Sequence, residues 1–95
     1  MIIAQLSIAP VGKDISLGKY VKIVIETLKN EPINIQTNAM ATVIEAEDLN
    51  TLLTAVGKAH NALFKVGANR VITELKIDDR KDKNVTLVSK LNSIK

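Results

Sequence analysis

Four segments of the chain alternate between apolar and polar side chains with the period of two that is typical of β-strands. In the clearest one, residues 71–77, one side carries Val71, Thr73, Leu75 and Ile77, and the other carries Ile72, Glu74 and Lys76. The four predicted strands are residues 2–9, 33–38, 40–46 and 71–77. No glycine marks the short connection between the second and third of them, so we expect a tight hairpin or a bulge there.

Two further segments repeat apolar residues at helical spacing. In the first they are Leu17, Tyr20, Val21, Val24, Ile25 and Leu28, and in the second Leu49, Leu52, Leu53, Val56, Ala59, Leu63 and Phe64. Ser16 and Asp48 are predicted N-caps, Pro32 stops the first helix, and Gly67 suits the position just after the second. Residues 85–94 favour a last short helix or an arm.

The order of these elements is β-α-β-β-α-β, followed by the C-terminal arm. This pattern predicts an α+β, ferredoxin-like sandwich over residues 1–95, in which a four-stranded antiparallel sheet carries two helices on one face. The other face is expected to mix Gln5, Ser7, Gln36, Glu74 and Lys76 with Ile3 and Ile72. Such a face suits either sheet-on-sheet association or a ligand held between subunits.

Charge is concentrated at the end of the chain. The net charge is +3, and residues 76–95 hold the whole excess. In the run 78–83, we expect Asp78, Asp79 and Asp82 to pair with Arg80 and the lysines. Because the surplus is small and interleaved with acids, it does not favour nucleic acid.

Composition narrows the function further. There is no cysteine, and Tyr20 and Phe64 are the only aromatic residues, so no aromatic platform for RNA lies on the predicted strands. No run is long enough to cross a membrane, and the apolar start lacks a basic leader, so we expect a cytoplasmic protein. A chain this small gains stability from association, which favours an oligomer.

Catalytic chemistry is not indicated. The single histidine, His60, lies on or beside an apolar helix stripe, where a packed or half-exposed role is the more common one. No catalytic triad, metal-ligand spacing or phosphate loop is visible, so neither an enzyme nor a cofactor is expected. Glu45, at the end of the third strand, could bind a ligand; its spacing favours instead a role in stabilising a helix N-terminus.

Four motifs resemble the thiamine-binding protein family of the MTH1187/YkoF-like type. The third motif is similar to the family pattern Met-Gly-Thr-x-x-Glu-Gly with alanine at both glycines, and His60 also matches a family histidine. The four are Ser7-Ile8-Ala9-Pro10-Val11-Gly12, Ser16-Leu17-Gly18-Lys19-Tyr20-Val21, Met40-Ala41-Thr42-Val43-Ile44-Glu45-Ala46, and Arg70-Val71 with Lys76-Ile77-Asp78-Asp79-Arg80-Lys81-Asp82-Lys83.

The resemblance implies non-catalytic binding of thiamine or its hydroxymethylpyrimidine part, at or near the subunit interfaces of a homotetramer built from dimers. By motif position it implies Thr42 and Glu45 as the first ligand residues, with Ser7, Lys76 and Asp78 as weaker ones. The alternative is a structural or regulatory oligomer that binds no small molecule.

Overall fold

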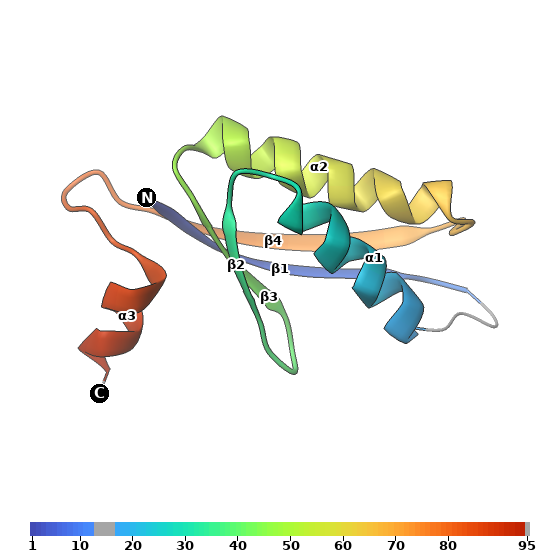
Figure 1. The fold of residues 1–95 in the computed structure, drawn as a ribbon, viewed down its shortest axis with the longest axis horizontal. Coiled ribbons are helices and arrows are strands. Elements are labelled where there is room, and N and C mark those ends of the chain that lie inside the picture. The colour runs from blue at the N-terminus through green and yellow to red at the C-terminus, as the bar shows by residue number, and fades with distance from the viewer. Residues whose placement is uncertain (13–16, 95) are drawn as a thin grey trace.

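The predicted α+β fold is confirmed by the computed structural model, which describes residues 1–12 and 17–94 (Figure 1). Ser16, the expected cap of the first helix, lies outside the described residues. The elements are β1 (Ile2–Pro10), α1 (Leu17–Lys29), β2 (Asn34–Thr37), β3 (Thr42–Ala46), α2 (Leu49–Lys65), β4 (Val71–Asp79) and α3 (Leu87–Ser93).

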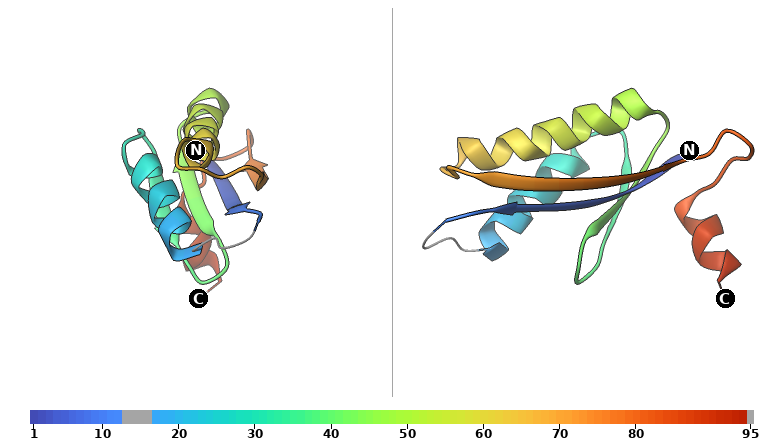
Figure 2. Two further views of the ribbon diagram at one scale, coloured as in Figure 1. Left: turned by 90° about the vertical axis from the view of Figure 1, so that its right-hand side faces the viewer. Right: turned by 180° about the vertical axis from the view of Figure 1, so that it is seen from behind.

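The strands form one sheet in the order β2-β3-β1-β4, and every neighbouring pair is antiparallel. Both long helices lie on the same side of this sheet, and α3 lies apart from them near the N-terminal end of β1 (Figures 1 and 2). The pairing places the even-numbered residues of β1 beside the odd-numbered residues of β4, as in the pair Leu6 and Leu75. These side chains face the helices, and the side chains between them form the open face.

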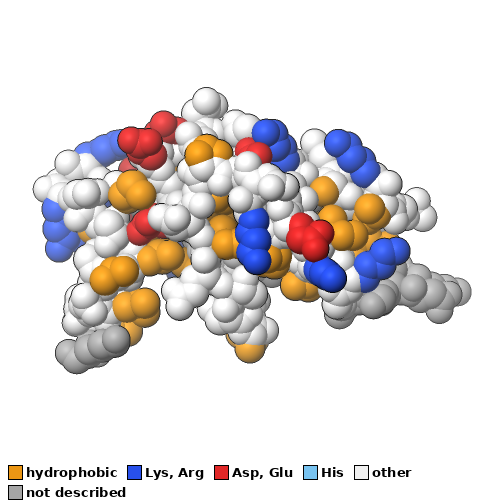
Figure 3. Space-filling model, viewed as in Figure 1, with side chains coloured by type: hydrophobic (Ala, Val, Ile, Leu, Met, Phe, Trp, Pro, Cys, Tyr) orange, Lys and Arg blue, Asp and Glu red, His pale blue; other side chains and the backbone are white. Residues whose placement is uncertain are grey.

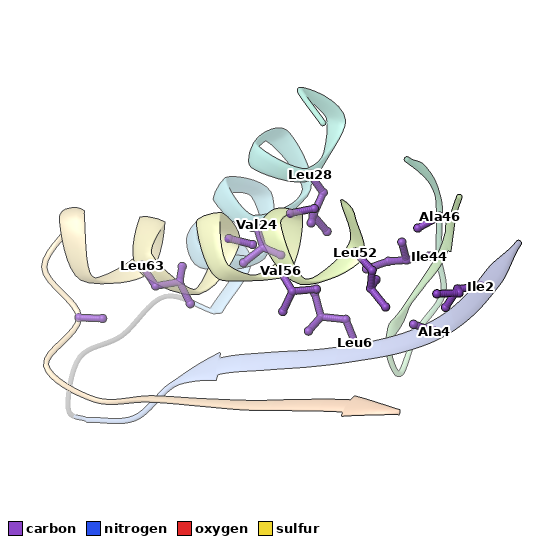
Figure 4. Packing of buried hydrophobic residues seen from close by; sticks show 13 residues of the cluster. Ile2, Ala4, Leu6, Val24, Leu28, Ile44, Ala46, Leu52, Val56 and Leu63 are labelled. Atoms are coloured by element: carbon purple, nitrogen blue, oxygen red, sulfur yellow. The ribbon is translucent and has the colours of Figure 1, made fainter. Parts of the chain in front are cut away.

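The core lies between the helices and the covered face of the sheet (Figure 4). Its largest fully buried side chains are Leu6, Leu28, Ile44, Leu52 and Leu63. They are aliphatic, as the near absence of aromatic residues requires. Truncating one such leucine to alanine typically costs about 2–5 kcal/mol, so these contacts hold the helices on the sheet.

Short local motifs fix the two ends of α2. The Asp48 side chain caps its start by accepting a 2.8 Å hydrogen bond from the Thr51 N–H. At its end, Gly67 has a φ of +107°, and the Ala68 N–H donates to the Leu63 carbonyl at 3.0 Å. This is a Schellman arrangement, in which glycine supplies the left-handed residue. Both predicted ends are therefore confirmed.

The β2–β3 connection is a hairpin made by an asparagine. The Asn38 Oδ1 accepts hydrogen bonds from the Met40 and Ala41 N–H groups at 2.8 and 2.9 Å. Because this side chain supplies the turn, no glycine is needed. The third strand consequently begins at Thr42, two residues later than the alternation predicted.

The C-terminal arm forms the expected short helix. Thr86 and Ser89 make a reciprocal capping box at the start of α3. Val85 is buried, whereas Val88, Leu91 and Ile94 are exposed. Apolar side chains are visible over this end of the molecule in Figure 3. The arm therefore buries only its first apolar residue within the chain.

Candidate ligand site

The five predicted ligand residues divide between the two faces of the sheet. Thr42 is paired with Leu6 and therefore lies on the face that the helices cover. Glu45 is paired with Ile3 and lies on the open face. Two residues three positions apart on one strand necessarily point in opposite directions. Thr42 and Glu45 thus cannot both contact one small ligand within a single chain.

Thr42 lines a cleft of about 160 Å³ between α1, β1 and the β2–β3 turn. Val21, Val24 and Ile25 form the α1 wall, and Leu6 and Ile8 contribute from β1. Polar groups come from Thr37, Asn38 and Thr42 at the hairpin. Pockets for drug-sized ligands are about 300–1,000 Å³, so this cleft suits something as small as a single ring.

The Glu45 carboxylate is occupied by partners within the chain. Its Oε1 accepts from the Asn34 side chain at 2.7 Å, and its Oε2 accepts from the Leu87 N–H at 2.8 Å. These two hydrogen bonds hold the pKa of Glu45 below its ordinary value. Leu87 is the first residue of α3, so the carboxylate lies at a helix N-terminus, where negative charge is favoured. We predicted from the sequence that Glu45 would stabilise the N-terminus of α2, the helix that follows it directly. In the structure it stabilises the N-terminus of α3 instead.

A second ionic contact holds the same arm. Asp78, which is opposite Ile3 on the open face, binds the Lys90 ammonium of α3 at 2.6 Å. The Lys90 contact lowers the pKa of Asp78. Ile3 is only 7% exposed although it lies on the open face, and Val85 is 8% exposed. The arm therefore covers this end of the open face and engages both of the predicted acidic ligand residues.

Ser7 and Lys76 are exposed at the middle of the open face. Together with Gln5 and Glu74 they line a shallow hollow of their own. Ser7 also lines the Thr42 cleft, although the alternation of β1 places its side chain on the open face. The structure thus brings Ser7 near Lys76, and it leaves Glu45 and Asp78 at the arm.

The remaining polar clusters have structural partners. The His60 Nδ1 lies 2.6 Å from the Thr73 hydroxyl, and its ring contacts Phe64 at a centroid distance of 5.5 Å. The expected charge pairs are present, since Arg80 binds Asp82 and Lys81 binds Asp79. Among residues 1–12 and 17–94, no cluster of three metal-ligating side chains is found. Within the same residues, no helix is long and apolar enough to cross a membrane.

Two parts of this arrangement were not predicted from the sequence. The role of Asn38 in shaping the cleft had a signal, because asparagine is a common turn residue where no glycine is present. The contacts of Glu45 with Asn34 and Leu87 join residues 11 and 42 positions away along the chain. The Asn34 contact follows from the register of the hairpin, which places residue 34 opposite residue 45, whereas no local pattern predicts the contact with Leu87.

The fold and the cleft define a ferredoxin-like α+β domain with an apolar, single-ring-sized cleft beside the hairpin. The family model described as thiamine-binding protein matches residues 4–95, and the chain belongs to this family.

Its relatives cover nearly the whole chain. It is 44% identical to the UPF0045 protein MJ1052 of Methanocaldococcus jannaschii over 93 residues, which are 98% of this chain and 91% of that protein. The crystal structure of MJ1052 superposes with a TM-score of 0.90 over 98% of this chain and 94% of that one. A UPF0045 protein of Methanothermobacter thermautotrophicus is 43% identical over 100% of this chain and 97% of its own length.

A more distant structure has the same fold. A Thermotoga maritima protein assigned to thiamine biosynthesis or salvage gives a TM-score of 0.84 at 17% identity, over 99% of this chain and 98% of that one. At this identity the likeness concerns the fold alone.

Proposed function

We propose that the protein binds thiamine or a related hydroxymethylpyrimidine without transforming it, as a cytoplasmic homotetramer built from dimers. The observation that carries this proposal is the match to the thiamine-binding family over residues 4–95. A non-catalytic role also agrees with the partners found for the reactive side chains, since His60 and the acidic residues named above contact other protein groups.

The cleft beside the β2–β3 hairpin is the place we propose for the pyrimidine ring. Its α1 wall offers aliphatic surface for the faces of a flat ring. The Thr42 hydroxyl can donate and accept hydrogen bonds, as an aminopyrimidine requires. Ser7 also lines this cleft, although the alternation of β1 places its side chain on the open face.

Glu45, Lys76 and Asp78 belong to a second group on the open face. They would meet a ligand only where another subunit covers that face, which is the interface position implied by the family resemblance. For Glu45 and Asp78, such a role also requires the arm to release their carboxylates.

Thermal unfolding with added thiamine or hydroxymethylpyrimidine tests the proposal. A ligand selective for the native state at about 100 times its Kd adds roughly 2.7 kcal/mol, so the melting temperature should rise by about 10–20 °C. We expect Thr42→Val, which keeps the shape and removes the hydroxyl, to lose most of this rise.

Glu45→Gln provides the matched comparison on the other face. If it abolishes the rise and Thr42→Val does not, the ligand lies on the open face and our placement is wrong. No rise for the unmodified protein at millimolar ligand would contradict the binding function itself. That result would favour the alternative of a structural or regulatory oligomer.

A further inference from the structure

The lining of the cleft beside the β2–β3 hairpin contains no charged side chain. Within the described part of the chain, all of its lining residues are aliphatic or are neutral and polar. Lys22 and Glu26, the nearest charges along α1, are exposed and do not line it. Tyr20 and Phe64 do not line it either. The described residues therefore give the cleft no carboxylate, no cationic group and no aromatic ring.

The Thr42 hydroxyl is a polar group of this cleft that lacks a partner within the chain. Thr42 is only 7% exposed, and among residues 1–12 and 17–94 its hydroxyl makes no hydrogen bond. In the same residues, no polar side-chain atom is both sealed from solvent and unpaired, so this hydroxyl is accessible from the cleft. Polar groups on residues this buried normally have a partner. A ligand in the cleft would supply it.

Asn38 adds a second polar group at the hairpin end of the cleft. Its Oδ1 is held by the Met40 and Ala41 N–H groups at 2.8 and 2.9 Å, which fixes the plane of the amide. The amide Nδ2 is left as a hydrogen-bond donor. A neutral aminopyrimidine carries both a donor amino group and acceptor ring nitrogens. The hydroxyl of Thr42 and the amide of Asn38 therefore match such a ring without any charge.

We propose that this cleft selects the neutral single ring, hydroxymethylpyrimidine, over both its phosphate ester and thiamine. The inference rests on the proposed function and specifies which of the related ligands the cleft takes. It follows from the uncharged lining and from the volume of the cleft, about 160 Å³.

A phosphate group is disfavoured by the missing cations. A phosphate monoester carries about −1.5 to −2 charges at pH 7, and proteins bind it with arginine or lysine side chains. The α1 wall offers only Val21, Val24 and Ile25. Placing an unpaired charge against aliphatic groups costs free energy, because the charge loses its water. The ester should therefore bind more weakly than the free alcohol.

The second ring of thiamine gains nothing from this cleft. The volume suits one ring, so the thiazolium ring of thiamine would stay outside. A bound cation is stabilised by a carboxylate or by the face of an aromatic ring, and the described lining has neither. Glu45 lies on the other face of the sheet. Thiamine should therefore bind no more tightly than the pyrimidine alone.

Isothermal titration calorimetry of the whole chain with three compounds tests this selectivity. The compounds are hydroxymethylpyrimidine, its phosphate monoester and thiamine. We expect the Kd of the ester to exceed that of the free pyrimidine by about tenfold or more, and the Kd of thiamine to be no lower than that of the pyrimidine.

A lysine in the α1 wall should reverse the discrimination against phosphate. Val21 lines the cleft and is 48% exposed, so Val21→Lys can place an ammonium group at its mouth without burying it. We expect the Kd ratio of ester to pyrimidine to fall by about tenfold. Leu53→Lys is the matched control, because Leu53 is equally exposed at 48% on α2 and does not line the cleft. It should leave the ratio unchanged.

The outcomes separate this selectivity from the binding function. Thiamine binding more tightly than the pyrimidine, an ester that binds as well as the pyrimidine, or an unchanged ratio in Val21→Lys would overturn the selectivity and leave the proposed function standing. Binding of none of the three compounds would overturn both.

Discussion

At the scale of single residues, Glu45 is the side chain whose position is most informative. It is charged and only 9% exposed, and both of its oxygens accept hydrogen bonds. A buried carboxylate is tolerated only when it is paired in this way. Glu45 thereby joins β3 both to its hairpin partner β2 and to the C-terminal arm, which is distant in sequence. Its first role in the isolated chain is to hold α3 against the sheet.

This role predicts an acid-sensitive contribution to stability. Because the pKa of Glu45 is lowered in the folded protein from an ordinary value of 4.5, its contribution is complete above pH 4.5 and is lost as the pH falls through the folded value. Glu45→Gln should therefore cost about 1 kcal/mol in the free energy of unfolding at pH 7 and much less at pH 3. Urea unfolding at the two pH values measures the difference.

Glu47→Gln is the matched control, because Glu47 is exposed two residues further along the chain. We expect it to change the stability little at either pH. A Glu45→Gln loss that is equally large at pH 3 and pH 7 would show that the charge is not what holds the arm.

Thr42 shows what the sequence could and could not reveal about the site. The motif that contains Thr42 and Glu45 suggested a shared ligand, but strand geometry separates them, and the spacing of three already carries that information. What could not be read from the sequence is the α1 wall of the cleft. Val21 and Ile25 fit the helical stripe equally well whether they pack into the core or line a hollow.

At the scale of elements, the helix ends of α2 show how closely local sequence sets the structure. Asp48 and Gly67 mark the start and the end of this helix through contacts with residues within four positions of them. The strands could be predicted from the sequence equally well, because the alternation of apolar and polar residues fixes both the element and the face. The arm was predicted as an element, but its docking depends on contacts that the arm's own sequence does not reveal. Glu45 binds the Leu87 N–H, Asp78 binds Lys90, and the Met1 amino group donates to the Asn84 side chain.

The glycine inside α2 and the one just after its end give opposite predictions for the same substitution. Gly57 lies in the helix interior, and an added methyl group would meet nothing within 4 Å, so Gly57→Ala should stabilise the protein by about 0.5–1 kcal/mol. Gly67 also has open space, but its φ of +107° disfavours a side chain, so Gly67→Ala should destabilise by about 1–2 kcal/mol. Denaturant unfolding of both variants, side by side, checks the pair. If Gly67→Ala were neutral, the Schellman end of α2 would not require glycine.

At the scale of the whole molecule, one chain has two surfaces left over after its own core is complete. The first is the free edge of β4, and the second is the open face with Gln5, Ser7, Glu74 and Lys76. The exposed apolar side of α3 lies beside that face, with Val88 66% exposed and Ile94 81% exposed. Association through these surfaces would build the tetramer of dimers that we propose.

The ligand is the part of this account that most needs a direct measurement. Native mass spectrometry of the purified protein, before and after addition of hydroxymethylpyrimidine, reports the assembly and the bound small molecule together. We predict an assembly with an even number of chains and one ligand mass per chain, and we predict that Thr42→Val forms the same assembly without the added mass. The proposed function would be contradicted if the assembly bound no hydroxymethylpyrimidine at millimolar concentration and carried no copurified small molecule.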